Sequence, residues 1–130
     1  MFAITLRIFA IACAGAALTH ALMGVSGDGV IGAPLASPID PTLDSQNRFY
    51  GAAFGLNAVL LWLSAKDVAR YASVLRAILA VMFVAGCMRG LAVIAHGWPS
   101  VQVMFLWSTE VLIPPVMWAW LNAALRRAGR

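Results

Sequence analysis

The chain has 130 residues, of which 62% are hydrophobic and 11% are charged, whereas soluble domains contain about 25% charged residues. This composition excludes an ordinary soluble domain and indicates a protein that lies in a lipid bilayer. The formal net charge of +4 does not indicate nucleic-acid binding, because the basic residues flank apolar segments and form no stripe with interleaved aromatic residues.

Four apolar segments follow one another along the chain, and each is long enough to cross a bilayer. A helix needs about 20 mostly apolar residues to span a hydrocarbon core of roughly 30 Å. The segments show no alternating strand pattern, and every backbone group in lipid needs an internal partner, so helices are expected. The sequence therefore predicts one all-α domain over residues 1–130, a polytopic membrane four-helix bundle. Its expected spans are about 4–25, 46–64, 72–95 and 101–125, with an outer loop over 26–45.

Basic residues predict the orientation, because Lys and Arg are retained on the cytoplasmic side of a membrane. The first and third connections contain neither residue. Both termini and the KDVAR turn are therefore expected in the cytoplasm, and the 26–45 loop and the HGWPS turn outside. The first segment resembles a signal peptide, but its apolar run is longer than usual, so it is expected to remain as a helix. The basic residues that set this orientation are Arg7, Lys66, Arg70, Arg76, Arg126, Arg127 and Arg130.

Ionisable residues inside membrane spans are costly, so each one marks a candidate functional site. Each of the four predicted spans has one near its outer end: His20, Arg48, Arg89 and Glu110. At a rise of 1.5 Å per residue, all four are expected within roughly 10 Å of the outer interface. Together with Asp44, one helical turn before Arg48, they predict a single polar cluster that opens to the outside.

Small residues share helix faces with these polar residues, since positions three, four and seven apart lie on one face. GAAFG shares a face with Asp44 and Arg48, and GCMRG contains Arg89. Patterns of the GxxxG type let helix backbones approach closely in lipid. We therefore expect the polar faces to point into the bundle and the bulky side chains to point to lipid. The glycines expected to pack helices are Gly51, Gly55, Gly86 and Gly90.

The fourth segment contains Pro114 and Pro115 at its centre, and a kink is predicted there because proline cannot donate a backbone hydrogen bond. Pro114 would leave the carbonyl of Glu110 without its usual donor. This arrangement occurs in the broken helices of transporters, but neighbouring groups or water also satisfy such carbonyls in ordinary membrane helices. Glu110 is expected either to form an interhelical ion pair with Arg89 or to change protonation during a transport cycle.

The remaining polar and reactive residues have simpler interpretations. Cys13 and Cys87 have no partner at metal-ligand spacing, so they are expected to be packing thiols and no metal site is predicted. The tryptophans, Trp98 and Trp107 among them, are expected at the membrane interface or facing lipid. The sequence Asp40-Pro41 predicts that a helix begins there. The 26–45 loop could act as a lid or be an ordinary surface segment.

Four motifs occur in order: DSQNRFYGAAFG at the start of the second span, MRGL in the third, the HGWP turn, and STE in the fourth. Together they resemble the small bacterial four-helix membrane proteins known only as a domain of unknown function (DUF4345). The resemblance covers nearly the whole chain and implies no activity. It directs attention to Arg48, Tyr50, Gly51, Arg89, Gly97, Pro99 and Glu110.

Three classes of function compete. An enzyme would need a nucleophile with its base, a metal set or a cofactor fingerprint, and none of the recognised patterns is present, so neither catalysis nor a cofactor is expected. The preferred hypothesis is a non-catalytic protein of the bacterial inner membrane. Its polar cluster, which includes Tyr50, would bind a lipid or another apolar ligand, or the chain would pack as an accessory subunit of a larger complex. The alternative is a small proton-coupled transporter that uses Glu110. Expected partners are membrane lipids, other membrane subunits or a second copy of the chain.

Overall fold

A computed structural model describes residues 1–35 and 37–128 of the chain; Arg130 lies outside the described residues. This part of the chain contains no strand, so the predicted all-α fold is confirmed. Its four α-helices cover the four predicted segments, and a 3-10 helix follows the first of them. The elements are α1 (Phe2–Met23), η1 (Gly24–Ile31), α2 (Pro41–Ser64), α3 (Ala72–His96) and α4 (Val101–Ala128).

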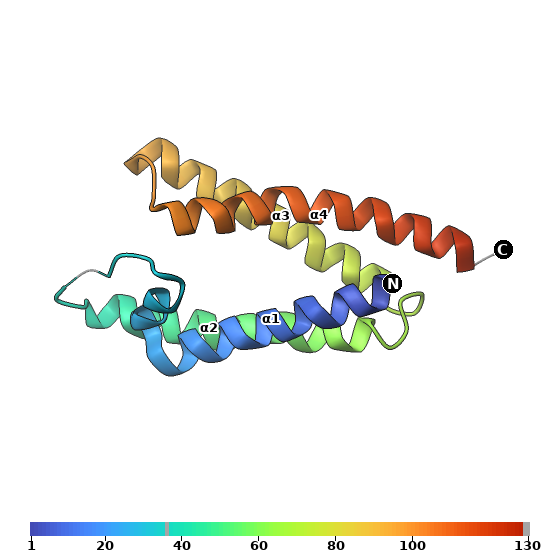
Figure 1. The fold of residues 1–130 in the computed structure, drawn as a ribbon, viewed down its shortest axis with the longest axis horizontal. Helices are drawn as coiled ribbons and strands as arrows, with labels where there is room; N and C mark the ends of the chain where they lie inside the picture. Colours follow the sequence, from blue (N-terminus) through green and yellow to red (C-terminus); the bar gives the residue numbers. More distant parts are fainter. Residues whose placement is uncertain (36, 129–130) are drawn as a thin grey trace.

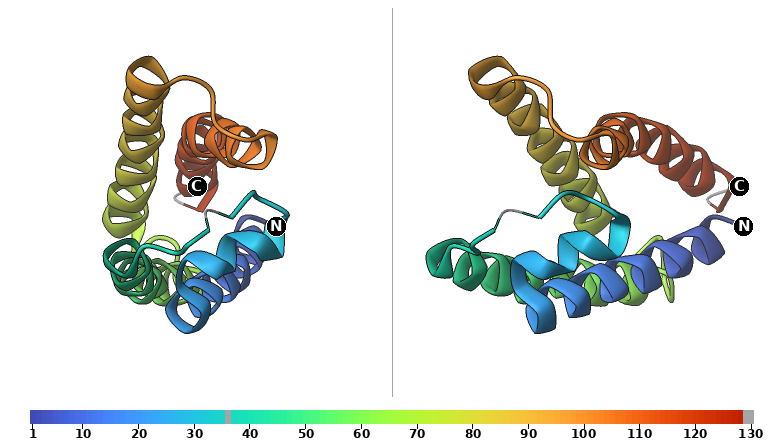
Figure 2. Two further views of the ribbon diagram at one scale, coloured as in Figure 1. Left: turned by 90° about the vertical axis from the view of Figure 1, so that its left-hand side faces the viewer. Right: turned by 60° about the vertical axis from the view of Figure 1, so that its left-hand side comes forward.

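The helices form two hairpins, α1 with α2 and α3 with α4, which meet at one end and diverge toward the other (Figures 1 and 2). The N-terminus, the turn between α2 and α3 and the end of α4 lie where the hairpins meet, and we call this the terminal end. The segment after α1 and the turn between α3 and α4 lie at the opposite end, the loop end. The fold is therefore closed at the terminal end and splayed at the loop end.

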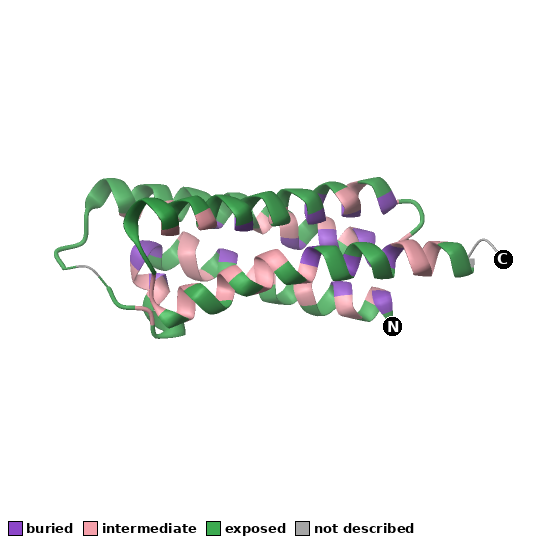
Figure 3. Ribbon diagram, turned by 90° about the horizontal axis from the view of Figure 1, so that it is seen from above, coloured by how far each residue is buried: buried purple, intermediate pink, exposed green. Residues whose placement is uncertain are grey.

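The hydrophobic core lies at the terminal end, where all four helices contribute to it. Leu6, Leu75 and Leu121 are almost completely buried. The outward faces of the helices are exposed along their length (Figure 3), and they present large apolar side chains that water would not favour over such an area. A lipid environment explains this distribution. The core consists of Phe2, Leu6, Ala10, Leu61, Ala65, Leu75, Ile78, Leu79, Met117 and Leu121.

Three helical stretches of the described residues are long and apolar enough to cross a membrane: Phe2–Ile31, Ala72–His96 and Val101–Arg127. This finding supports a membrane protein. Helix α2 is not among them, because polar residues in its first half, such as Asn47 and Arg48, lower its mean hydropathy. With 24 residues and a rise of 1.5 Å each, α2 extends about 36 Å, which is enough to cross a bilayer. The fourth span thus stays a prediction.

The start of α2 follows from its capping residue. Asp40 Oδ1 accepts hydrogen bonds from the backbone N–H groups of Thr42, at 2.7 Å, and Leu43, at 3.0 Å. Pro41 occupies the first turn, where its missing N–H has no cost. The N–H of Leu43 and then that of Thr42 hold the pKa of the Asp40 carboxyl below its usual range. The predicted helix start is confirmed, and α2 begins before the span expected from residue 46.

Helix α4 continues through Pro114 and Pro115 without interruption. Pro114 is among the most deeply buried residues of the fold, whereas Pro115 is exposed. A kink at this point stays a prediction.

Candidate functional site

The first set of polar contacts joins the start of α2 to the end of α1. Arg48 Nε donates to Asp44 Oδ2 at 2.8 Å, and its Nη1 donates to the carbonyl oxygens of Leu22, at 2.5 Å, and Ala21, at 3.4 Å. Asp44 Oδ1 accepts from the N–H of Val25 at 3.0 Å. The last carbonyls of a helix have no partner within it, and a cation is favourable beside them. Arg48 therefore caps the C-terminus of α1, and Asp44 holds it in place.

These contacts lower the pKa of Asp44 and restrict which residue can follow α1. The hydrogen bond from Arg48, and then that from the N–H of Val25, hold the pKa of the Asp44 carboxyl below its usual range. Gly24 ends α1 with a φ of 60°, a conformation that side chains with a Cβ rarely adopt. A Cβ there would also collide with the Asp44 carboxylate. The position thus requires glycine.

His20 and Gly51 lie at a close contact between α1 and α2. A Cβ on Gly51 would lie 2.7 Å from both Ala21 N and His20 Cβ, so the two backbones approach directly at this point. His20 Nε2 lies 3.9 Å from Asp28 Oδ1. His20 Nδ1 is buried and has no hydrogen-bond partner within the described part of the chain.

Tyr50, which is predicted to belong to the polar cluster, lies outside this set. Its side chain is 63% exposed, and its ring packs edge-on against that of Phe49, with centroids 5.7 Å apart.

The second set joins α3 to α4. Arg89 Nε lies 2.6 Å from Glu110 Oε2, so the predicted ion pair is present. Trp107 Nε1 donates to the carbonyl oxygen of Gly86 at 2.7 Å. A Cβ on Gly86 would lie 3.2 Å from the backbone carbon of Glu110, which shows that the two helices are close here. The indole of Trp107 covers Gly90, whose Cβ would lie 3.3 Å from Trp107 Cζ2.

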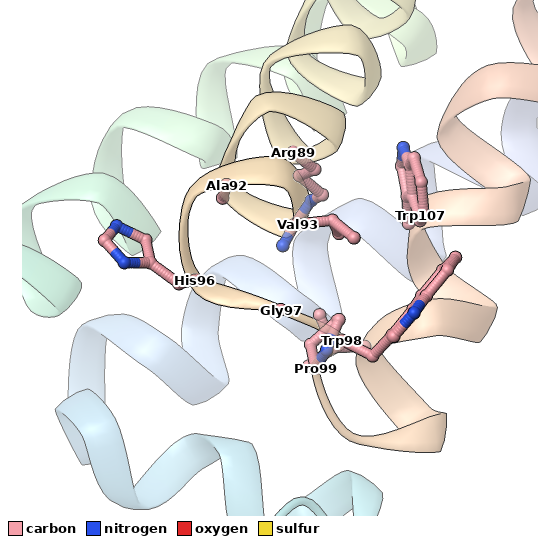
Figure 4. Close-up of a pocket in the computed structure, with 9 residues that line it drawn as sticks. Arg89, Ala92, Val93, His96, Gly97, Trp98, Pro99 and Trp107 are labelled. Atoms are coloured by element: carbon pink, nitrogen blue, oxygen red, sulfur yellow. The ribbon is translucent and has the colours of Figure 1, made fainter.

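A hollow of about 290 Å³ lies at the loop end of the α3–α4 hairpin (Figure 4). Arg89 lines it from α3, and the rings of Trp98 and Trp107 line it from the turn and from α4, with centroids 6.3 Å apart and planes at 48°. Its other walls are mainly apolar. His96 also borders the hollow, but Figure 4 shows its ring directed away from the tryptophans. The lining residues are Arg89, Ala92, Val93, His96, Gly97, Trp98, Pro99, Val103 and Trp107.

A second hollow, of about 320 Å³, lies on the outside of the first hairpin between α1 and α2. Its walls are apolar, and no charged residue is among those that line it. Its lining residues are Ala10, Ile11, Ala14, Ala58, Val59, Trp62 and Leu63.

The structure holds the predicted polar residues in two sets, one in each hairpin, whereas the sequence predicts one cluster. Within residues 1–35 and 37–128, no hydrogen bond or ion pair joins Asp44 or Arg48 to Arg89 or Glu110. The physical reason is the divergence of the hairpins toward the loop end, which separates the two sets (Figure 1). Each set finds its partners inside its own hairpin.

A hydrogen bond links the two hairpins at the loop end: Gln102 Nε2, at the start of α4, donates to the carbonyl oxygen of Gly32 at 3.0 Å. The segment after η1 thus reaches the opposite hairpin. This position is compatible with either interpretation of the 26–45 loop, a lid or a surface segment.

Sequence reasoning missed the pairing of Trp98 with Trp107 and the contact of His20 with Asp28. Trp98 and Trp107 are expected only as interfacial or lipid-facing residues, and their meeting depends on how the HGWP turn returns the chain. One signal for the position of Trp107 is present in the sequence. Gly86 and Gly90 lie four residues apart on one face of α3, and two glycines leave room there for a large side chain of the next helix. Across the described residues, no group of three or more His, Cys, Asp and Glu side chains could hold a metal ion.

A family model described as a domain of unknown function (DUF4345) matches residues 1–121. The match includes both polar sets and every residue that lines the two hollows. Comparison with curated proteins and with solved structures finds no match.

Proposed function

Because the chain belongs to the DUF4345 family, a domain of unknown function, we propose a function from the geometry of its own residues. The protein is a non-catalytic membrane protein that binds a lipid, with the polar part of the lipid in the hollow beside Arg89. The single observation that supports this function is the combination of apolar walls, two tryptophans and one guanidinium around about 290 Å³.

The walls of the hollow match the usual composition of a ligand site. Such sites are mostly apolar and contain a few polar groups that fix the orientation of the ligand. Ligand pockets usually measure about 300–1,000 Å³, so this hollow has room for a head group rather than a whole lipid. The acyl chains would extend out of the hollow into the surrounding lipid.

The charge distribution supports an orientation with both termini in the cytoplasm and the hollow in the outer leaflet. Lys66, Arg70, Arg126 and Arg127 are exposed and lie at the terminal end. Near the loop end, by contrast, Arg89 is paired with an acid. Lys and Arg close to the ends of membrane spans are retained on the cytoplasmic side, so the terminal end is expected to face the cytoplasm. We place the protein in the inner membrane of a bacterium, as the resemblance in its sequence implies.

A second candidate function, an accessory subunit of a larger membrane complex or of an assembly with a second copy, is favoured by the splayed hairpins. Their outward faces present large apolar side chains that α1 to α4 leave uncovered (Figure 3). In this proposal GAAFG and GCMRG pack helices within each hairpin, and the remaining faces contact lipid or a partner. A proton-coupled transporter has less support, since Glu110 is held by Arg89 and does not line the hollow.

Native mass spectrometry on protein extracted with its own lipids tests lipid binding. We expect the 13.8 kDa chain to retain one lipid mass, and Val93→Trp, which fills the hollow, to lose it. Val81→Trp is the matched control, because Val81 is exposed on the same helix and does not line the hollow. Equal retention by the two variants would exclude the hollow as the site. A stable species with other proteins and no lipid would instead support the accessory subunit.

A further inference from the structure

Arg89 has hydrogen-bond donors that the protein does not use. Its Nε donates to Glu110, and the described residues include no acceptor for the N–H groups on its two terminal nitrogens. The side chain is 45% exposed and lines the hollow. A guanidinium presents its donors in a planar fork that matches the oxygens of a phosphate. The unused donors are therefore suited to a phosphate group in the hollow.

Two indole rings border the same hollow. Trp107 is held in place by its hydrogen bond to Gly86, and Trp98 lies at 48° to it, so that the two rings form an angled corner. The face of an indole attracts cations, and paired aromatic rings are a common site for ammonium groups. A positively charged group is therefore favoured on the side of the hollow away from Arg89.

The net charge around the hollow favours a ligand that is itself neutral overall. Arg89 and Glu110 neutralise each other, so a head group with net negative charge would place an uncompensated charge near Glu110. A zwitterionic head group brings its own cation. The volume of about 290 Å³ leaves room for a head group of this size.

We propose that the hollow selects the zwitterionic head group of a phospholipid, with its phosphate on the free donors of Arg89 and its ammonium group against Trp98 and Trp107. This inference rests on the proposed function, lipid binding in the hollow, and it adds the class of lipid.

The test compares lipids that share the same acyl chains in nanodiscs: phosphatidylethanolamine, phosphatidylglycerol and diacylglycerol, each read by native mass spectrometry. Loss of one cation–π contact corresponds to about a two- to fivefold change in binding. We expect the full chain to retain phosphatidylethanolamine over phosphatidylglycerol by at least this factor, and diacylglycerol least. Trp98→Leu, which leaves Trp107 in place, should lower the preference between the two phospholipids by about two- to fivefold. Trp118→Leu is the control, since Trp118 lies on α4 away from the hollow.

The role of Arg89 is tested with the double variant R89Q/E110Q, which removes the charge without leaving Glu110 unpaired in the membrane. We expect its preference for phosphatidylethanolamine over diacylglycerol to be smaller than in the unchanged protein, because only the contacts of the ammonium group with the tryptophans remain. Soluble phosphoethanolamine has the same phosphate and ammonium groups as the lipid but no acyl chains, so it distinguishes a site for a lipid from a site for a small soluble compound. We expect it not to displace the lipid. Displacement by the soluble compound, or an unchanged preference in either variant, would overturn the inference. Retention of all three lipids without preference would contradict this inference alone, whereas no retained lipid would contradict the proposed function.

Discussion

Replacing Gly51 with alanine should push α1 and α2 apart. A Cβ at this position would lie 2.7 Å from Ala21 N and His20 Cβ, and 2.9 Å from the backbone carbon of His20. Carbon atoms in contact prefer about 3.5–4.0 Å, so α1 must move by about 1 Å. The same movement would strain the hydrogen bonds from Arg48 to the last carbonyls of α1.

The expected cost follows from two opposing terms. Overpacking costs about 1–3 kcal/mol, and the upper part of this range applies because backbone atoms cannot rotate away from the new methyl group. Alanine is favoured over glycine within a helix by about 1 kcal/mol. Taken as about 2–3 kcal/mol against about 1 kcal/mol, these terms predict a net destabilisation of about 1–2 kcal/mol for Gly51→Ala.

Gly55→Ala is the matched control, because it makes the same chemical change one turn later in GAAFG. Its Cβ would meet Ala17 Cβ at 3.6 Å, an ordinary contact, so only the helix preference of up to about 1 kcal/mol applies and the variant should be slightly more stable. Unfolding followed by circular dichroism during a titration with sodium dodecyl sulfate measures both variants. Equal stability of the two, or a more stable Gly51→Ala, would refute the close approach of α1 and α2.

Three further predictions concern the other close contact and the two polar sets. Gly86→Ala should destabilise the α3–α4 hairpin, because its Cβ would lie 3.2 Å from the backbone of Glu110; the same titration measures it. Arg89→Ala and Glu110→Gln should each lower stability, and the double variant should cost less than their sum. The expected coupling is about 0.6–1.7 kcal/mol, from the average to the maximum for hydrogen bonds between membrane helices. The pKa of Asp44 is lowered by Arg48 from the ordinary value of 3.8, so its stabilising contribution is present above that pH and lost as the pH falls below it. Asp44→Asn should therefore be less stable at neutral pH, with a shallower loss of stability in acid, as thermal unfolding at several pH values can show.

These predictions have clear controls and contrary outcomes. Gly15→Ala is the control for Gly86→Ala, because a Cβ on Gly15 would meet nothing within 4 Å; equal effects would contradict the contact. Additive effects of Arg89→Ala and Glu110→Gln would show that the ion pair contributes no coupling. If Asp44→Asn and the unchanged protein lost stability in parallel as the pH fell, the hydrogen bonds to Asp44 would not account for the acid sensitivity.

The class of fold and the local contacts could be predicted from the sequence, because they depend on one helix at a time. Apolar length predicts helices that suit a membrane, and the order Asp40-Pro41 predicts where α2 begins. The spacing of Asp44 and Arg48 places both on one face of α2. Each of these features is determined within a few turns of the chain, and the structure retains them.

Some contacts within one hairpin could be predicted from the sequence, and others could not. The ion pair between Arg89 and Glu110 could be predicted, because α3 and α4 are joined by a short turn and an isolated charge in lipid would be costly. Arg48 was expected to face the interior of the bundle, but its hydrogen bonds to the carbonyls of Ala21 and Leu22 depend on the exact approach of α1, which no spacing within α2 can specify.

The relation of the two hairpins was decided only in the tertiary structure. Hydropathy and helical spacing describe single helices and contain no distance between them, so they place every polar residue at one level without showing which ones meet. The large core side chains lie at the terminal end and hold all four helices there. Toward the loop end the hairpins diverge, and each pairs its own charges. The separation of the polar sets and the corner formed by Trp98 and Trp107 follow from that uneven packing.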